Sequence, residues 1–172
     1  MISSRENEYI IKTQAMFFYF YLINNVIYIE RSENGHKGKR KKLINDIKEF
    51  AVDLSEENTI NMVCLDTSDR LFHLYYKDGK WRKRLIIDLS MSSIRLRDLR
   101  LFINSDKLNL ICLRSHIPRK NIWRIVHYTF YKRTWSGCDI GEVTINKYLS
   151  TYKIDIDANH NIHIVYRPLK DN

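Results

Sequence analysis

Residues 50–87 read FAVDLSEENTINMVCLDTSDRLFHLYYKDGKWRKRLII, and their pattern indicates the fold of the whole chain. Four short runs rich in apolar, β-branched and aromatic residues are separated by polar stretches at 55–58, 67–69 and 77–80. Such residues favour strands, and Asp78-Gly79 is a strong signal for a two-residue hairpin turn. The stretch therefore predicts four antiparallel strands that are joined by tight turns.

The same order of runs recurs on both sides of this stretch. Aligning Phe20, Cys64, Cys112 and Val165 gives steps of 44, 48 and 53 residues, and a four-stranded propeller blade takes about 40–50 residues. We predict an all-β chain of β-propeller-like blades, each of four antiparallel strands, with about three and a half blades in a single domain. The expected units span 9–46, 47–94, 95–147 and a half unit at 148–172. A β-sandwich or an open meander is the alternative.

Composition agrees with a globular β-rich chain. The 172 residues are 44% hydrophobic and 12% aromatic, which excludes a disordered chain and is typical of one domain. Of the three cysteines, Cys64 and Cys112 lie within apolar runs, and their spacing with Cys138 matches no metal motif. We interpret them as small buried apolar residues in a reducing compartment.

The apolar stretch at 15–29 does not have the pattern of a membrane span. Asn24-Asn25 divides it into two halves that are too short to cross a bilayer as helices. No basic segment precedes it and no cleavage site of small residues follows it. We therefore expect a hairpin here, and a cytoplasmic protein with no membrane partner.

Two segments resemble patterns found in bacterial β-propeller repeat proteins. Residues 157–166, DANHNIHIVY, resemble the Asp–Asn turn that precedes an Ile-His-Val-Val-Tyr type strand. Residues 76–81, YKDGKW, resemble the Tyr-x-Asp-Gly-x-Trp turn between outer blade strands of sialidase-like and lectin-like propellers. The resemblance extends over residues 9–167. The Asp-box and the catalytic residues of sialidases are absent, so the resemblance implies a shape and no catalytic residue.

The half unit predicts an oligomer. An incomplete ring leaves strand edges and apolar end faces open, and two such chains would form one ring of about seven blades. We expect a homodimer in which residues 152–167 contribute to a shared blade. The apolar residues that would need partners there are Ile154, Ile156, Ile162, Ile164 and Val165. In the alternative, this hairpin pairs with the chain's own first strand in one small ring.

Cations cluster after the hairpins, and the net charge is +9. In a propeller these positions fall on the outermost strands, at the rim. A basic rim near aromatic rings would bind nucleic acid or another polyanion by neutralising phosphates and stacking. Lys and Arg on outer strands also prevent edge pairing and maintain solubility. The candidate binding residues are Lys39, Arg40, Lys41, Lys42, Trp81, Arg82, Lys83, Arg84 and Trp135. Lys132 and Arg133 occupy the matching place in the third unit.

The two tryptophans of this set, Trp81 and Trp135, have two interpretations. They could form sugar-stacking platforms between blades. Alternatively they pack the blades together, since aromatic side chains bury large areas.

Catalytic patterns are not evident. We find no phosphate-binding Gly-rich loop, no Ser-His-Asp order and no short metal-ligand motif, and we expect no catalytic residue, metal or cofactor. Asp53, Asp66, Asp155 and Asp157 recur near strand ends. Paired carboxylates there could make a glycan hydrolase or lyase, but Asp at turns also bonds local backbone.

The histidines favour structural roles. His73 and His127 occupy similar strand positions, and a His-lined pocket at the centre of the ring is the alternative. The favoured hypothesis is a non-enzymatic binding or scaffold module for a glycan or another polyanion. A glycan-processing enzyme and a nucleic-acid-binding protein with a basic rim remain alternatives.

Overall fold

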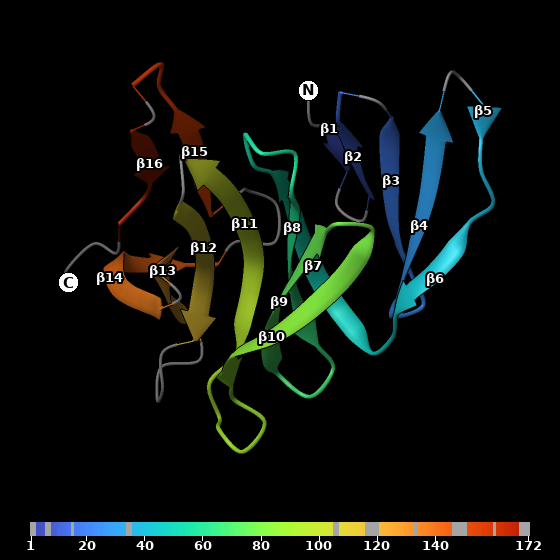
Figure 1. The fold of residues 1–172 in the computed structure, drawn as a ribbon. Coiled ribbons are helices and arrows are strands. Elements are labelled where there is room, and N and C mark those ends of the chain that lie inside the picture. Colours follow the sequence, from blue (N-terminus) through green and yellow to red (C-terminus); the bar gives the residue numbers. More distant parts are fainter. Residues whose placement is uncertain are drawn as a thin grey trace.

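The computed structural model describes residues 3–5, 8–14, 16–33, 36–104, 107–115, 121–132, 134–145, 151–159 and 161–168 (Figure 1). Within these ranges the chain forms strands, turns and bends, and no helix. Alternating and continuous apolar runs bounded by Asn, Asp and Ser account for this result.

Antiparallel strands form four sheets that follow one another along the chain. The first sheet holds β1 (Ser3–Arg5), β2 (Glu8–Lys12), β3 (Phe17–Ile23), β4 (Val26–Glu33), β5 (His36–Lys37) and β6 (Lys41–Ile44). The second holds β7 (Ile47–Leu54), β8 (Ile60–Asp66), β9 (Arg70–Lys77) and β10 (Lys80–Asp88). The third holds β11 (Leu96–Asn104), β12 (Lys107–Ser115), β13 (Ile122–Tyr131) and β14 (Thr134–Thr144). The fourth holds β15 (Tyr152–Ile156) and β16 (Ile162–Tyr166).

The sheets lie side by side in chain order, from the blue first sheet to the red fourth sheet in Figure 1. Their inner strands adjoin, since β2 contacts β7 and β7 contacts β11. The hydroxyl of Tyr152 on β15 continues this row by donating to the carbonyl of Asp98 on β11 at 2.6 Å. This is a propeller-like arrangement of about three and a half blades, and the predicted fold class is confirmed. The first sheet exceeds the predicted four strands because β1 and β5 add to it.

The core lies between neighbouring sheets. Phe18 and Phe20 of the first sheet pack on Met62 and Cys64 of the second. A second cluster packs Val63 and Leu65 against Leu110 and Cys112 of the third sheet, and a third packs Ile111 and Leu113 against β15 and β16. Each fully buried Leu, Ile or Phe contributes about 1.5–3 kcal/mol relative to exposure.

The sequence alignment of the repeats at Phe20, Cys64, Cys112 and Val165 is shifted by one residue in the first and in the last unit. Cys64 and Cys112 both face the preceding sheet. Phe20 instead faces the following sheet. Val165 points away from the third sheet and is 70% exposed, whereas Ile164 packs against that sheet. Because successive strand residues point to opposite faces, alignment at Phe20 and Val165 reverses the side-chain direction. Apolar residues on both faces of these strands concealed the offset.

The fourth sheet has partners within the chain. Ile154, Ile162 and Ile164 pack on the third sheet of the same chain, and the blade shared between two subunits stays a prediction. The opposite face of this sheet carries exposed Lys153 and His163 together with exposed Val165.

The turns follow the residue types that favour positive φ. Asn24 and Asn25 have φ of 50° and 61°, as their predicted hairpin requires. Asp46 likewise has a positive φ of 58°, and β7 begins directly after it at Ile47. Arg133, which the sequence places in the basic segment of the third unit, lies outside the described residues.

Candidate functional site

The predicted basic residues lie at the outer edges of the first two sheets. Lys41 and Lys42 are on β6, whose partner is β4, and Lys39 and Arg40 immediately precede it. Arg82–Arg84 lie in β10, the last strand of the second sheet. All seven side chains are exposed. The structure thus places these cations on outer strands, in agreement with the sequence-based expectation.

These seven cations lack acidic partners among the described residues, whereas several other cations of the chain have one. Arg70 contacts Asp66 at 2.8 Å and Arg114 contacts Asp139 at 2.7 Å, but none of the seven forms an ion pair. Their charge is therefore uncompensated. A concentration of one sign of charge raises the local concentration of oppositely charged ligands.

Aromatic rings support several of these cations. Lys83 Nζ lies 3.6 Å from the centre of the Phe72 ring, and Arg84 lies 5.4 Å from that of Phe130. Alternation along β10 directs Lys83 toward the first sheet and Arg84 toward the third. The edge therefore presents cations toward both neighbouring sheets.

The two tryptophans of the predicted site pack between sheets. Trp81 meets Phe20 of the first sheet edge-on at 6.1 Å, and Trp135 meets His73 of the second sheet edge-on at 6.3 Å. Both are partly buried. Trp135 Nε1 is buried with no hydrogen-bond partner among the described residues. Their contacts agree with the packing interpretation, and a role in binding stays a prediction.

A pocket of about 590 Å³ opens where the inner strands meet. It is lined by Tyr9, Ala51, Val52, Asp53, Arg100, Leu101, Phe102, Tyr152, Lys153, Ile154 and Ile156. Its volume is within the range of small-molecule sites. Among the described residues, Asp53 is the carboxylate that lines it.

Two carboxylates of β7 fasten the second sheet to the third. Asp53 Oδ1 accepts from the Leu54 N–H at 2.8 Å, and its Oδ2 accepts from the Ile103 N–H at 2.7 Å. Glu49, four residues earlier, accepts from the Leu99 N–H, four residues before Ile103. Burial raises the pKa of both carboxyls, although the backbone N–H groups oppose this. The hydrogen bonds of Glu49 and Asp53 therefore give both carboxylates a structural role, because they connect the second sheet to the third.

The other predicted carboxylates bond turn backbone. Asp66 accepts from Ser68 and Arg70. Asp155 accepts from the adjacent Ile156 N–H at 2.9 Å. Asp157 accepts from His163 and Asn161, and these bonds hold the pKa of its carboxyl well below the usual range. The arrangement shows no pair of free carboxylates among these residues.

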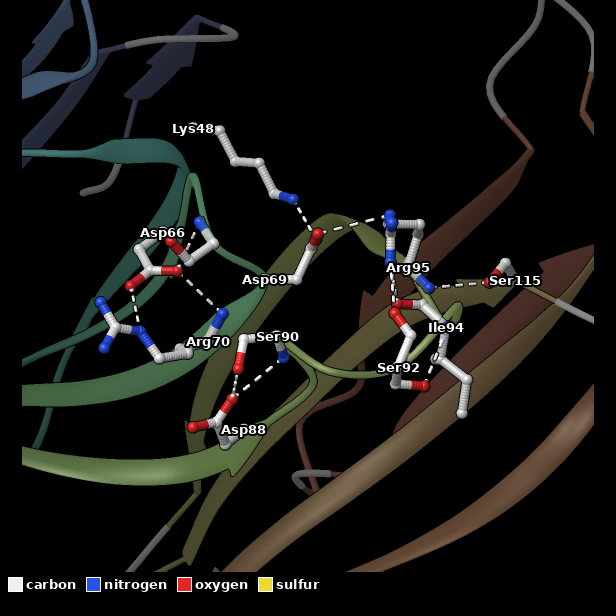
Figure 2. Close-up of polar contacts among 11 residues, drawn as sticks. Lys48, Asp66, Asp69, Arg70, Asp88, Ser90, Ser92, Ile94, Arg95 and Ser115 are labelled. Carbon is white, nitrogen blue, oxygen red and sulfur yellow. Dashed lines mark hydrogen bonds and ion pairs between the residues drawn. The ribbon is translucent and has the colours of Figure 1, made fainter.

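A polar network joins the second and third sheets at the β8–β9 turn (Figure 2). The Asp69 carboxylate lies between Lys48 of β7 and Arg95, whose Nε is 3.3 Å away. The Arg95 N–H donates to Ser115 Oγ at 2.7 Å. Asp69 is thus shared by two cations.

No group of three or more His, Cys, Asp or Glu in the described part of the chain is arranged to bind a metal ion.

Sequence reasoning missed an aromatic face on the first sheet. Phe17, Tyr19 and Tyr21 alternate with the buried Phe18 and Phe20, and so point away from the second sheet. The alternation was visible in the sequence. The uninterrupted aromatic run concealed which of its two faces lies inside.

Comparison with known proteins identifies the fold. The sequence matches no protein-family model, and no curated protein is significantly similar to it. The structure is similar to a bifunctional GH43-CE protein of Bacteroides eggerthii, with a TM-score of 0.55 and 13% identity over 95% of this chain. The chain spans 21% of that protein's length. The N-terminal domain of Nup159 gives a TM-score of 0.44 and 9% identity, covering 90% of this chain and 52% of that one. The fold of this chain is β-propeller-like, as its similarity to the GH43-CE protein supports.

At these identities the likeness extends to the fold alone. The described residues contain no helix that is long and apolar enough to cross a membrane.

Proposed function

We propose that this protein is a non-enzymatic binding module that binds polyanions through β6 and β10. The observation that carries the proposal is the set of seven exposed cations at 39–42 and 82–84, none with an ion pair among the described residues. Cations kept only for solubility could equally be paired or dispersed. Here seven unpaired cations are concentrated in two short segments, 39–42 and 82–84, and the ion pairs of the described residues lie elsewhere.

Edge strands suit this role. β10 is the last strand of the second sheet and pairs with β9 alone among the described residues, and its side chains point alternately toward the first and the third sheet. An extended anionic polymer could therefore follow the strand and contact successive cations. Such binding releases counterions, and its affinity falls steeply with salt.

The test compares charge-matched variants in heparin binding over a range of salt concentrations. One variant carries Arg82→Gln, Lys83→Gln and Arg84→Gln. The control removes three exposed, unpaired cations away from β6 and β10, by Arg97→Gln, Lys107→Gln and Arg167→Gln. We expect the first variant to lose at least about tenfold in affinity, since each hydrogen bond to a charged group contributes about 1.5–3 kcal/mol.

The affinity of the β10 variant should also depend less steeply on salt. The control variant should bind heparin with nearly the affinity and the salt dependence of the unaltered protein. Equal losses in both variants would show that only net charge matters. Absent binding by the unaltered protein would leave solubility as the role of these cations.

A further inference from the structure

The outer face of the first sheet carries a row of three aromatic rings on β3. Phe17, Tyr19 and Tyr21 share this face, and Phe17 is 40% exposed. The ring centres of Phe17 and Tyr19 are 6.5 Å apart, and the rings are tilted by 32°. No strand of the other sheets packs on this face among the described residues.

Each ring has its own cation. Lys12 lies 5.7 Å from the centre of Phe17, Lys37 lies 5.1 Å from Tyr19, and Arg40 lies 4.7 Å from Tyr21. The three cations come from β2, β5 and the segment before β6, so the fold assembles them from separate parts of the chain.

Acidic groups offset this charge only in part. Glu30 lies opposite Tyr19 and approaches Lys37 to 3.9 Å, and Glu8 lies opposite Tyr21. Lys12 and Arg40 have no ion pair among the described residues, and Lys42 adds a cation opposite Tyr28. The face therefore remains positive.

The chemistry of this face differs from that of the blade-packing faces. In the second and third sheets, the second-strand residues that face the preceding sheet are aliphatic or thiol residues: Ile60, Met62, Cys64, Leu108, Leu110 and Cys112. All six are buried. β3 has rings there instead, and β4 places Ser32 and Glu30 across from Phe17 and Tyr19. A neighbouring blade would bury these charges, and a second copy of the same face would oppose like charges. A ligand that is both aromatic and negatively charged would match the rings and the positive charge of this face.

We propose that this face binds single-stranded nucleic acid, with bases stacked on Phe17, Tyr19 and Tyr21 and phosphates held by Lys12, Lys37 and Arg40. A nucleotide couples one flat ring to one negative charge, and the face offers one ring and one cation at each step along the strand. The ring spacing of 6.5 Å is close to twice the nucleotide rise of about 3.4 Å. This goes beyond the proposed function, because only Arg40 among these three cations belongs to the set at 39–42 and 82–84.

The test separates stacking from charge by using two probes, an oligothymidylate and heparin. The variant Phe17→Leu, Tyr19→Leu, Tyr21→Leu removes the rings and keeps every cation. We expect its oligothymidylate affinity to fall by at least about tenfold, because stacking on one ring alone contributes about 1–3 kcal/mol per base. The salt slope should be unchanged, and heparin affinity should stay the same.

Three results would overturn the inference. The first is oligothymidylate affinity that the ring variant does not change. The second is an equal loss for heparin, which would assign the rings to an anionic glycan. The third is a dimer that Tyr19→Leu dissociates, which would show that a second copy covers the face. Failure of the proposed function is distinguishable, because it appears as unaltered heparin binding in the β10 charge variant.

A second measurement needs no variant and does not depend on how the ring substitutions affect folding. Photocrosslinking of an iodouracil-containing oligonucleotide to the unaltered protein, followed by peptide mass spectrometry, should modify residues of β3. Adducts confined to other strands would contradict the inference.

Discussion

Nε2 of His73 lies 2.9 Å from Oδ1 of Asn61, and both side chains are buried. The same pair recurs in the third sheet, where Nε2 of His127 lies 3.0 Å from Oδ1 of Asn109. In each pair the Asn amide donates to a backbone carbonyl two residues earlier in the chain, from Asn61 to Thr59 and from Asn109 to Lys107. The histidines therefore satisfy buried polar groups in equivalent positions, in agreement with their predicted structural role.

Acid should destabilise the protein through His73. Burial, aided by Arg84, lowers the pKa of this side chain to about 4, compared with about 6.5 in an unfolded chain. As pH falls below about 6.5 the unfolded state takes up the proton first, so stability is complete above that pH and is lost toward pH 4. A tenfold difference in proton affinity between the two states corresponds to about 1.4 kcal/mol, so we expect a loss on the order of 2–3 kcal/mol.

Urea denaturation at a series of pH values measures this loss. His73→Gln should flatten the profile, and His36→Gln, at an exposed position on β5, should leave it unchanged. A profile that both substitutions leave unaltered would assign the acid sensitivity to other groups.

Asp53→Asn should destabilise the protein by about 1.5–3 kcal/mol, the usual contribution of a hydrogen bond to a charged group. Its two oxygens accept from different N–H groups, those of Leu54 and Ile103, and an amide has only one oxygen to accept with. Asp155→Asn is the matched control, because Asp155 bonds the adjacent Ile156 N–H at an exposed position. It should change the free energy of unfolding by no more than about 0.5 kcal/mol. Equal effects in chemical denaturation would argue against a tie between sheets.

Ile164→Asp and Val165→Asp should have opposite outcomes although the two residues are neighbours. Ile164 packs on the third sheet, so an aspartate there would bury an unpaired charge and cause unfolding or aggregation. Val165 is exposed and should tolerate the change. Thermal melting and light scattering distinguish the two. If both variants aggregated, the outer face of β16 would have to be covered in solution, as a shared blade requires.

Thiol labelling of the native protein should modify Cys138 alone. Cys64 and Cys112 are buried, and burial raises the pKa of both thiols, which disfavours the reactive thiolate. Cys138 is exposed. Mass spectrometry after brief maleimide treatment should therefore find one adduct per chain, and additional adducts should appear only in denaturant. Rapid labelling of Cys64 would indicate that the interface between the first two sheets opens.

The fold class, the strands of the second and third sheets and the outer-strand position of the basic segments could all be predicted from the amino-acid sequence. Strand propensity, turn chemistry and repeat length are local properties, so 50–87 already predicted the four strands from β7 to β10. The Asn24-Asn25 and Asp78-Gly79 turns were legible for the same reason, since few residue types tolerate positive φ.

The direction of side chains and the assembly of the sites depend on contacts between sheets, which local pattern does not reveal. An aromatic run such as 17–21 conceals its buried face, because a shift of one residue exchanges both faces. Packing against the second sheet selected Phe18 and Phe20 for the core and left Tyr19 outside. The cations over that face come from segments up to 28 residues apart in sequence, with Lys12 and Arg40 at the extremes. They come together because β2 and β4 pair with β3, and β5 and β6 pair with β4.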